Sequence, residues 1–275
     1  MARPRKEPGT ALTTPKSTLP IDMNKEMADE VAALASRLAR PTGDRIGITK
    51  AGTFKTPDGQ ELEMLEAIIV DFVNTNSYYD KPYVKGQIDA PVCFAIGLEP
   101  TMMVPSPNSP DIQSETCAAC WANQFGSHPN GKGKACSNSK LLALLPPDAD
   151  TETTLQTLKV PATSIKNFDS YVGSVARAFQ RPVRAVVTEI TSDSGIGWEN
   201  AKFGNPRPCT TEQLLMAHSR KVEAMDRLMV EPDIVAMQAQ AAAAPAPTRG
   251  RPGKPADKPV ARGRPAARGR PAARG

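Results

Sequence analysis

The chain of 275 residues lacks the features that define several large classes of protein. No apolar stretch approaches the roughly 20 residues of a membrane span, and no secretory signal is recognisable, so we expect a soluble, cytoplasmic protein with no membrane partner. No Walker loop is present, which argues against a nucleotide triphosphatase. The only histidines, His128 and His218, have no Glu two residues on, so the His-x-Glu of zinc deaminases is missing. Clustered carboxylates typical of metal-dependent nucleases are missing too, and we predict a non-enzymatic protein.

Aromatic residues make up only 5% of the chain, yet seven of the thirteen lie between Phe72 and Phe125. Flat rings can stack on unpaired bases while lysines contact phosphates, which is the combination that single-strand binding requires. The alternative is a tyrosine-rich loop that packs against its own domain. The first group of candidate nucleic-acid contacts is Tyr78, Tyr79, Lys81, Tyr83 and Lys85.

Cysteine is also rare, but four of the five cysteines have the spacing of metal ligands. Cys117 and Cys120 form a Cys-x-x-Cys turn, with Cys93 upstream and Cys136 downstream. Such a turn can place two thiolates on one tetrahedral Zn²⁺, and four thiolates leave no open position for a reactive water. The spacing therefore predicts one structural zinc ion, with Cys209 as a spare thiol.

The identity of the fourth ligand is open at this point. His128 lies between Cys120 and Cys136 and is the alternative to Cys93. We favour Cys93 because residues 90–96 are apolar and predict a strand that would hold a ligand in place, although a free cysteine there is also compatible with simple burial. A disulfide framework fits poorly, because the cysteine count is odd and the chain is long.

The segment between Cys120 and Cys136 adds further candidate contacts. It contains a glycine-rich, basic turn, Gly-Lys-Gly-Lys, whose amides and ammonium groups can meet a phosphate. Its two aromatic rings can extend the stacking surface. The candidate residues are Trp121, Phe125, Lys132 and Lys134.

The net charge of +5 is distributed unevenly. Residues 245–275 contain nine Lys and Arg and one Asp, a net charge of +8, while residues 17–244 sum to −6. Composition divides the chain into a disordered basic arm at 1–20, a zinc-containing domain at 21–230 and a disordered basic tail at 231–275. Any binding groove on the acidic body must therefore be a local positive patch.

Periodicity predicts a mainly β domain with added helices. We expect helices over 24–40, 164–181 and 210–229, the last with Thr210 and Gln213 as a capping box. A turn at 56–59 should join a strand near 46–48 to a second strand over 62–73, and further strands are expected at 90–96, 140–145, 154–160, 183–190 and 198–203. This α+β pattern favours an OB-fold-like small antiparallel barrel with a structural zinc loop.

Three Arg-Gly-Arg-Pro cores in the tail resemble AT-hooks. The resemblance implies that their arginines enter the narrow minor groove of A·T-rich duplex DNA. A generic basic tail that adheres to any nucleic acid is the alternative. The arginines concerned are Arg249, Arg251, Arg262, Arg264, Arg268 and Arg270.

The stretch from Phe72 to Leu145 contains a recurrent set of residues: Cys93, Cys117, Cys120, Asn123, Gly126, Ser127, Gly133, Lys134 and Cys136. This stretch resembles a pattern of phage single-stranded DNA-binding proteins, and the zinc-stapled OB-fold of the T-even helix-destabilising protein is a looser parallel. The resemblance implies single-stranded DNA binding in phage replication or recombination, with replication or recombination proteins as further partners. The alternative is an architectural or regulatory duplex-DNA protein whose zinc domain contacts another protein.

Overall fold

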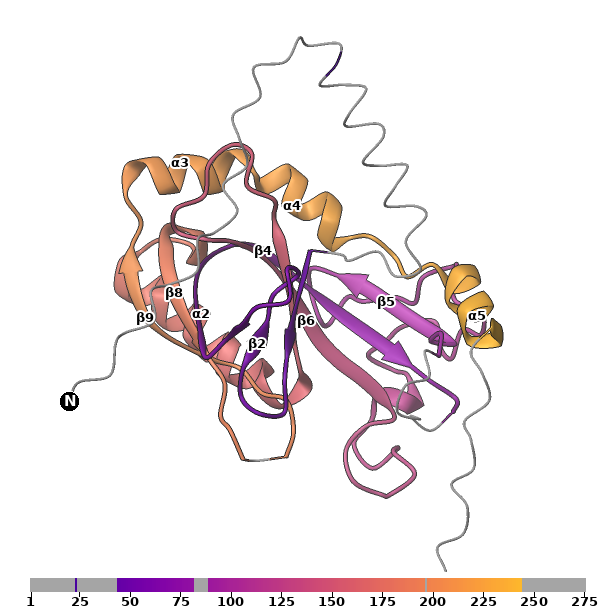
Figure 1. The fold of residues 1–275 in the computed structure, drawn as a ribbon. Helices are drawn as coiled ribbons and strands as arrows, with labels where there is room; N and C mark the ends of the chain where they lie inside the picture. The colour runs from indigo at the N-terminus through magenta and orange to yellow at the C-terminus, as the bar shows by residue number, and fades with distance from the viewer. Residues whose placement is uncertain (1–22, 24–43, 82–88, 196, 244–275) are drawn as a thin grey trace, which may run out of the picture.

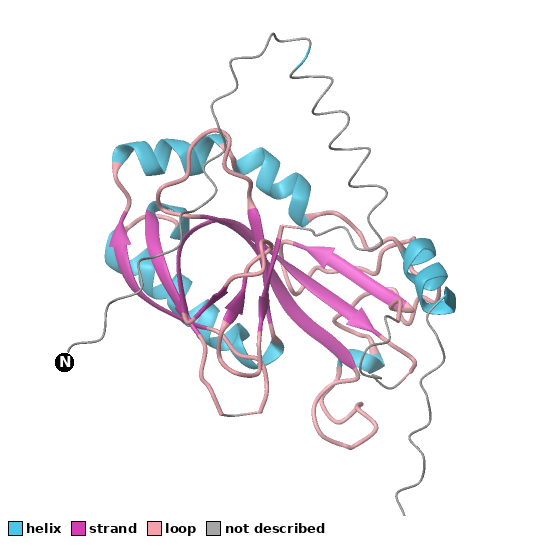
Figure 2. Ribbon diagram, in the orientation of Figure 1, coloured by secondary structure: helices cyan, strands magenta, loops and turns pink. Residues whose placement is uncertain are grey.

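The computed structural model describes residues 23, 44–81, 89–195 and 197–243. In these residues one nine-stranded, curled sheet is combined with a few helices, a mixed α+β, barrel-like architecture (Figures 1 and 2). No helix in the described part of the chain is long and apolar enough to cross a membrane. The strands are β1 Arg45–Ile48, β2 Phe54–Lys55, β3 Glu61–Leu62, β4 Met64–Tyr78, β5 Cys93–Gly97, β6 Cys136–Leu145, β7 Gln156–Val160, β8 Val186–Thr191 and β9 Lys202–Pro208. The helices are η1 Trp121–Asn123, η2 Ala162–Ser164, α2 Ile165–Phe179, η3 Val183–Ala185, α3 Thr211–Ser219, α4 Lys221–Leu228 and α5 Ile234–Ala243.

Strand β4 organises the sheet. Along one edge it pairs with β8 over Met64–Ile68 and with β5 over Asn74–Tyr78, and along the other edge it pairs with β6. All of these pairs are antiparallel, whereas β1 pairs with β7 in parallel. A bulge between Ile69 and Asp71 interrupts the β4–β6 register, and bulges bend and twist a strand.

The two ends of the curled sheet approach each other through backbone atoms. Gly52, in the turn between β1 and β2, has a φ of 85°, and a Cβ there would lie 2.7 Å from the amide nitrogen of Ser194. Ser194 belongs to the connection between β8 and β9. Glycine is required at this position both for its conformation and for the close approach.

Hydrophobic cores form on both faces of the sheet. On one face, α2 contributes Phe168, Tyr171 and Val175 to a cluster that includes Leu65 and Ile69 of β4. On the other face, α3 and α4 pack against a cluster that includes Ile68, Val70 and Val73. Alternate β4 residues thus face opposite cores, and the bulge shifts the alternation by one residue.

A buried lysine joins the α2 core to the polar end of the sheet. The Nζ of Lys140 donates a hydrogen bond to Asn74 Oδ1 at 2.8 Å and forms an ion pair with Asp169 of α2 at 3.1 Å. It also lies over the rings of Phe72 and Phe168, at 5.4 and 5.9 Å from their centroids. The buried charge is therefore both paired and hydrogen-bonded, as burial requires.

Most expected elements are present, with shifted boundaries. The structure confirms strands at β5, β6, β7, β8 and β9, the helix α2 and the Thr210–Gln213 capping box. The side chain of Ser164 does not cap α2, because its Oγ accepts a hydrogen bond from the amide of Ala201 instead. The helix expected over 210–229 is divided at Arg220 into α3 and α4.

The strand expected near 46–48 is confirmed as β1, but the expected hairpin was wrong in both of its strands, because β1 pairs with β2. The turn at 56–59 is present, with Gly59 N bonded to Thr56 O, but it joins β2 to the short strand β3. The long strand β4 pairs with β5, β6 and β8 instead. The helix expected over 24–40 and the basic arm at 1–20 lie outside the described residues, and α5 falls inside the segment that we assigned to the tail.

We predict that Phe168→Ala lowers the free energy of unfolding by about 3 to 5 kcal/mol, because it leaves a cavity in the core. Phe168 is 0% exposed and makes edge contacts with Phe72 and Phe203, both at 5.0 Å between ring centroids. Phe125→Ala is the matched control, since that ring is 84% exposed and its loss should change stability by less than about 0.5 kcal/mol. Urea unfolding of both variants provides the measurement, and equal destabilisation would contradict the assignment of the core.

Candidate functional site

Four cysteines converge at the end of β4. Tyr78, the last residue of β4, is directly opposite Cys93 of β5 on one side and Cys136 of β6 on the other. Directly opposed residues point to the same face of a sheet, so the two cysteines flank the tyrosine. Cys117 and Cys120 come from the long connection between β5 and β6, and all four cysteines are buried.

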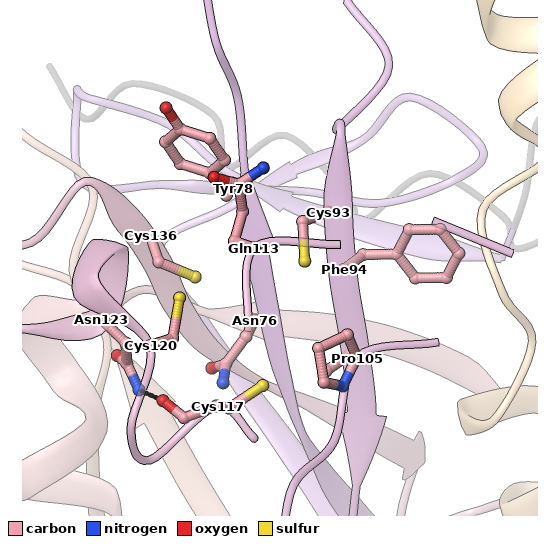
Figure 3. A pocket seen from close by; sticks show the side chains of 11 residues that line it. Asn76, Tyr78, Cys93, Phe94, Pro105, Gln113, Cys117, Cys120, Asn123 and Cys136 are labelled. Atoms are coloured by element: carbon pink, nitrogen blue, oxygen red, sulfur yellow. Dashed lines mark hydrogen bonds between the residues drawn. The ribbon is translucent and has the colours of Figure 1, made fainter. Parts of the chain in front are cut away.

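The four cysteines line one small cavity of about 20 Å³. Figure 3 shows the sulfur atoms of the four cysteines directed toward this space. Asn76 and Asn123 line the same cavity. Among the described residues, however, no group of three or more His, Cys, Asp or Glu side chains is arranged to hold a metal ion. The structure thus brings the predicted ligands together without placing them in a coordination geometry, and the zinc ion stays a prediction.

The cavity distinguishes the two candidates for the fourth ligand. Cys93 lines it with the other three cysteines, whereas His128 is exposed and lies outside its lining. The Nδ1 of His128 accepts a hydrogen bond from the amide of Asn130 at 3.3 Å, within its own turn. This arrangement favours Cys93. Cys209 lies apart, with its thiol 3.8 Å from the carbonyl oxygen of Arg184.

Burial disfavours the thiolate form of these cysteines. It raises the pKa of Cys136 to about 12, and the neighbouring Cys117, Cys120 and Cys93 add to this rise. Burial likewise raises the pKa of Cys117, although a hydrogen bond with Asn76 acts in the opposite direction. Four thiols this close cannot all become anions unless a cation compensates them.

The connection from Cys117 to Cys136, here called the cysteine excursion, is held by side-chain hydrogen bonds to its own backbone. Asn123 donates to the carbonyl oxygen of Cys117 at 2.8 Å and accepts from Lys134 Nζ at 3.0 Å. Ser127 Oγ donates to Ala122 O and accepts from the amide of Ala135, both at 2.9 Å. The amide of Gly126, with a φ of 88°, bonds to Gly133 O at 2.7 Å. The residues that carried the sequence resemblance therefore have a structural role.

The cysteine excursion carries an exposed aromatic and basic surface. Trp121 is 50% exposed and Phe125 is 84% exposed. Trp121 makes an edge contact with Tyr78 at 5.4 Å between ring centroids, and its Nε1 donates to Gln113 Oε1 at 3.2 Å. Lys134 Nζ lies 5.5 Å from the centroid of Phe125, and Lys132 is exposed nearby in sequence. We call Trp121, Phe125, Lys132 and Lys134 the excursion surface.

The two predicted tyrosines within the described residues, Tyr78 and Tyr79, differ in their surroundings. Tyr78 lines the cysteine cavity and is half-buried against Trp121. This ring therefore packs against its own domain, as the alternative interpretation of the sequence predicted. Tyr79 does not line that cavity and is partly exposed, and desolvation raises the pKa of its phenol. Lys81 lines a different cleft, next to α5. Tyr83 and Lys85, like the six tail arginines, lie outside the described residues.

Sequence reasoning missed the polar residues beneath the cavity. Asn76 lines it, and the Nδ2 of Asn138 donates to Asn76 Oδ1 at 2.6 Å. Asn74, two residues earlier, holds Lys140 and donates to the carbonyl oxygen of Leu98 at 2.7 Å. Two asparagines separated by one residue in a strand lie on the same face, and buried asparagines need hydrogen-bond partners. The spacing of Asn74 and Asn76 could therefore have predicted a buried polar cluster on this face of the strand.

Comparison with protein-family models, with curated proteins and with solved structures found no match to the chain. Function must therefore be inferred from the chain's own residues.

We predict that Asn123→Ala loosens the cysteine excursion, because the Cys117 carbonyl and the Lys134 ammonium group both lose a partner. The cost should be about 1 to 2 kcal/mol. Hydrogen exchange should accelerate at the amides of Gly126 and Ala135 while β4 and β6 remain protected. Lys132→Ala, at an exposed position of the same excursion, is the control. Unchanged exchange in the Asn123 variant would show that these bonds do not hold the excursion.

Proposed function

We propose that the protein is a non-enzymatic single-stranded DNA-binding protein that acts in phage DNA replication or recombination. The observation that carries this proposal is the excursion surface. Its rings Trp121 and Phe125 are exposed, Lys134 Nζ lies 5.5 Å from the centroid of Phe125, and Lys132 is exposed on the same segment. Rings without a packing partner on one side can stack on bases, and the ammonium groups can meet the backbone phosphates. The phage context rests on the sequence resemblance.

The distribution of charge supports single strands over duplex as the ligand of the body. Residues 17–244 have a net charge of −6, so general attraction to a polyanion is weak there. Stacking needs unpaired bases, which a duplex hides, and it adds affinity that does not depend on net charge. In the same proposal the barrel-like sheet is of the OB type, because its long strand β4 pairs along both edges and carries a bulge, and bulges curve a sheet toward a barrel.

The proposal includes one structural Zn²⁺ held by Cys93, Cys117, Cys120 and Cys136. The donor set fits: four buried thiols face a cavity of about 20 Å³, roughly the space of one water-sized sphere. Bound zinc would supply the positive charge that four neighbouring thiolates require, and it would fix both ends of the cysteine excursion. No catalytic role follows, since four thiolates complete the coordination shell.

The second candidate is an architectural or regulatory duplex-DNA protein. The three Arg-Gly-Arg-Pro cores of the tail favour it, because arginines in that setting suit the narrow minor groove of A·T-rich DNA. In the first proposal the same tail adds duplex affinity to a single-strand-binding body. The two candidates differ in whether the excursion surface binds bases.

We predict one zinc ion per chain in the purified protein. Cys120→Ser should lose the metal and lower the unfolding temperature, because a missing ligand opens the site. His128→Ala and Cys209→Ser should retain the metal, since neither residue lines the cavity. Elemental analysis and thermal unfolding give the readouts. Full zinc content in Cys120→Ser, or its loss in His128→Ala with retention in Cys93→Ser, would refute the ligand set.

We predict that Trp121→Ala and Phe125→Ala each weaken binding of a single-stranded oligonucleotide by about 1 to 3 kcal/mol. Trp198→Ala is the matched control, because that ring is 55% exposed but belongs to the connection between β8 and β9. Fluorescence anisotropy on the full chain, with zinc content checked in parallel, gives the dissociation constants. If both excursion variants bind the single strand as tightly as the unmodified chain does, the result favours the second candidate, a duplex-DNA protein.

A further inference from the structure

One face of the sheet changes from apolar to polar beyond the core that α3 and α4 cover. Val73, Leu141 and Ala143 belong to that core. Two residues further along β4 and two residues earlier on β6, the same face carries Thr75 and Ser139. These two residues are directly opposite each other, and a hydrogen bond of 2.7 Å joins their hydroxyl groups. The face therefore continues as a polar surface where the core ends.

Strand register places two basic residues on this face. Lys159 of β7 is directly opposite Leu141, and Arg45 of β1 is directly opposite Thr157, two residues earlier on β7. Directly opposed residues, and residues two apart in a strand, share a face of a sheet. Lys159 and Arg45 therefore lie on the same face as Leu141, whereas Ile46, next to Arg45, belongs to the core on the other face.

Tyr79, directly after β4, adds an aromatic ring that is 39% exposed. Desolvation raises the pKa of its phenol, and Asp89 adds to this rise. A hydrogen bond with the side chain of Ser77 and the positive charge of Arg45 act in the opposite direction. Arg45 thus lies close enough to Tyr79 to act on it electrostatically, although β6 and β7 separate their strands in the sheet.

The two cations of this face are close together and incompletely compensated. Burial lowers the pKa of the half-buried Lys159, and the neighbouring Arg45 lowers it further, while Glu199 acts in the opposite direction. The ion pairs of the described residues include neither Lys159 nor Arg45. Like charges held close together in a partly desolvated setting favour an anion beside them. We call the following residues the polar row: Arg45, Lys159, Ser139, Thr75, Ser77 and Tyr79.

We propose that the polar row is a second surface for single-stranded DNA, with Arg45 and Lys159 on phosphates and a base stacked on Tyr79. Hydroxyl groups of the row can form hydrogen bonds with phosphate oxygens. The body has a net charge of −6, so a polyanion needs a local positive patch of this kind. This inference rests on the proposed function for the class of its ligand, but it uses none of the residues of the excursion surface.

Single-stranded DNA matches the polar row better than an acidic peptide or a duplex does. Each nucleotide carries a flat base and a phosphate, and the row offers a ring and two cations. An acidic peptide has no base to stack on Tyr79. A duplex hides the faces of its bases, so the ring would have no partner there either.

The test measures binding of a labelled single-stranded oligonucleotide to the full chain, by fluorescence anisotropy at several salt concentrations. Arg45→Gln with Lys159→Gln should weaken binding by about tenfold or more and reduce the slope of log K against log salt concentration by about 1.4, since each phosphate contact on a single strand contributes about 0.7. Lys50→Gln with Lys166→Gln removes the same charge from two exposed positions outside the row and should change the slope little. Arg45→Lys with Lys159→Arg keeps both charges and should keep the slope.

The ring of Tyr79 gives a second measurement. Tyr79→Ala should weaken single-strand binding by about fivefold to a hundredfold, because a stacked base loses its platform. Tyr79→Phe keeps the ring and should bind as the unmodified chain does. Neither variant should change the salt slope, since the ring carries no charge. Thermal unfolding of each variant checks that the body stays folded.

The outcomes separate this inference from the proposed function. No single-strand binding by the unmodified chain overturns both. Binding that Trp121→Ala and Phe125→Ala weaken, but that the Arg45 and Lys159 double Gln variant changes no more than its lysine control does, overturns the inference alone. Competition by polyglutamate as strong as by unlabelled single strand also overturns it, because the row would then bind an acidic peptide equally well. Weaker binding and a smaller slope in the double Gln variant, with unchanged binding in the excursion variants, supports the polar row and places the single strand there.

Discussion

The simultaneous pairing of β4 with β5 and β6 is the constraint on which the rest of the structure depends. At its first residues β4 lies between hydrophobic cores on both faces of the sheet, and at its last residue it lies between two cysteines. One strand therefore carries both the stability of the domain and the position of the site. Without both pairings, Cys93 and Cys136 would have no fixed relation to each other.

The face of β4 that carries the site changes in character along the strand. Leu65 and Ile69 belong to the apolar core, Phe72 follows after the bulge, and Asn74 and Asn76 then meet Lys140 and Asn138. The bulge makes this order possible, because it moves even-numbered residues onto the face that odd-numbered residues occupied before it. Polar groups thus enter the interior only where partners are available to them.

Local sequence patterns were sufficient for some parts of the fold and insufficient for others. The apolar spacing of α2 and the Thr210–Gln213 box were readable because their contacts lie within a few residues. The partner of β4 was not readable, since strand pairing depends on residues far apart in the chain and the bulge leaves no distinctive residue. The cysteine spacing brought four residues into one prediction, and the structure placed them around one cavity. The position of Tyr78 in the lining of that cavity was not readable, because a loop-like composition concealed that Tyr78 ends a strand between Cys93 and Cys136.

The placement of the cysteine excursion also bears on the order in which the chain folds. The connection that contains it leaves β5 and enters β6, which pair with opposite edges of β4, so the ends of this connection come together only after both long-range pairings have formed. Contacts between residues distant in sequence are entropically costly to close, and they form late unless other contacts prepare them. The barrel-like body can therefore assemble before the excursion is ordered. Changes of sequence on the excursion would then alter the exposed surface of the finished protein with little effect on how fast its body folds.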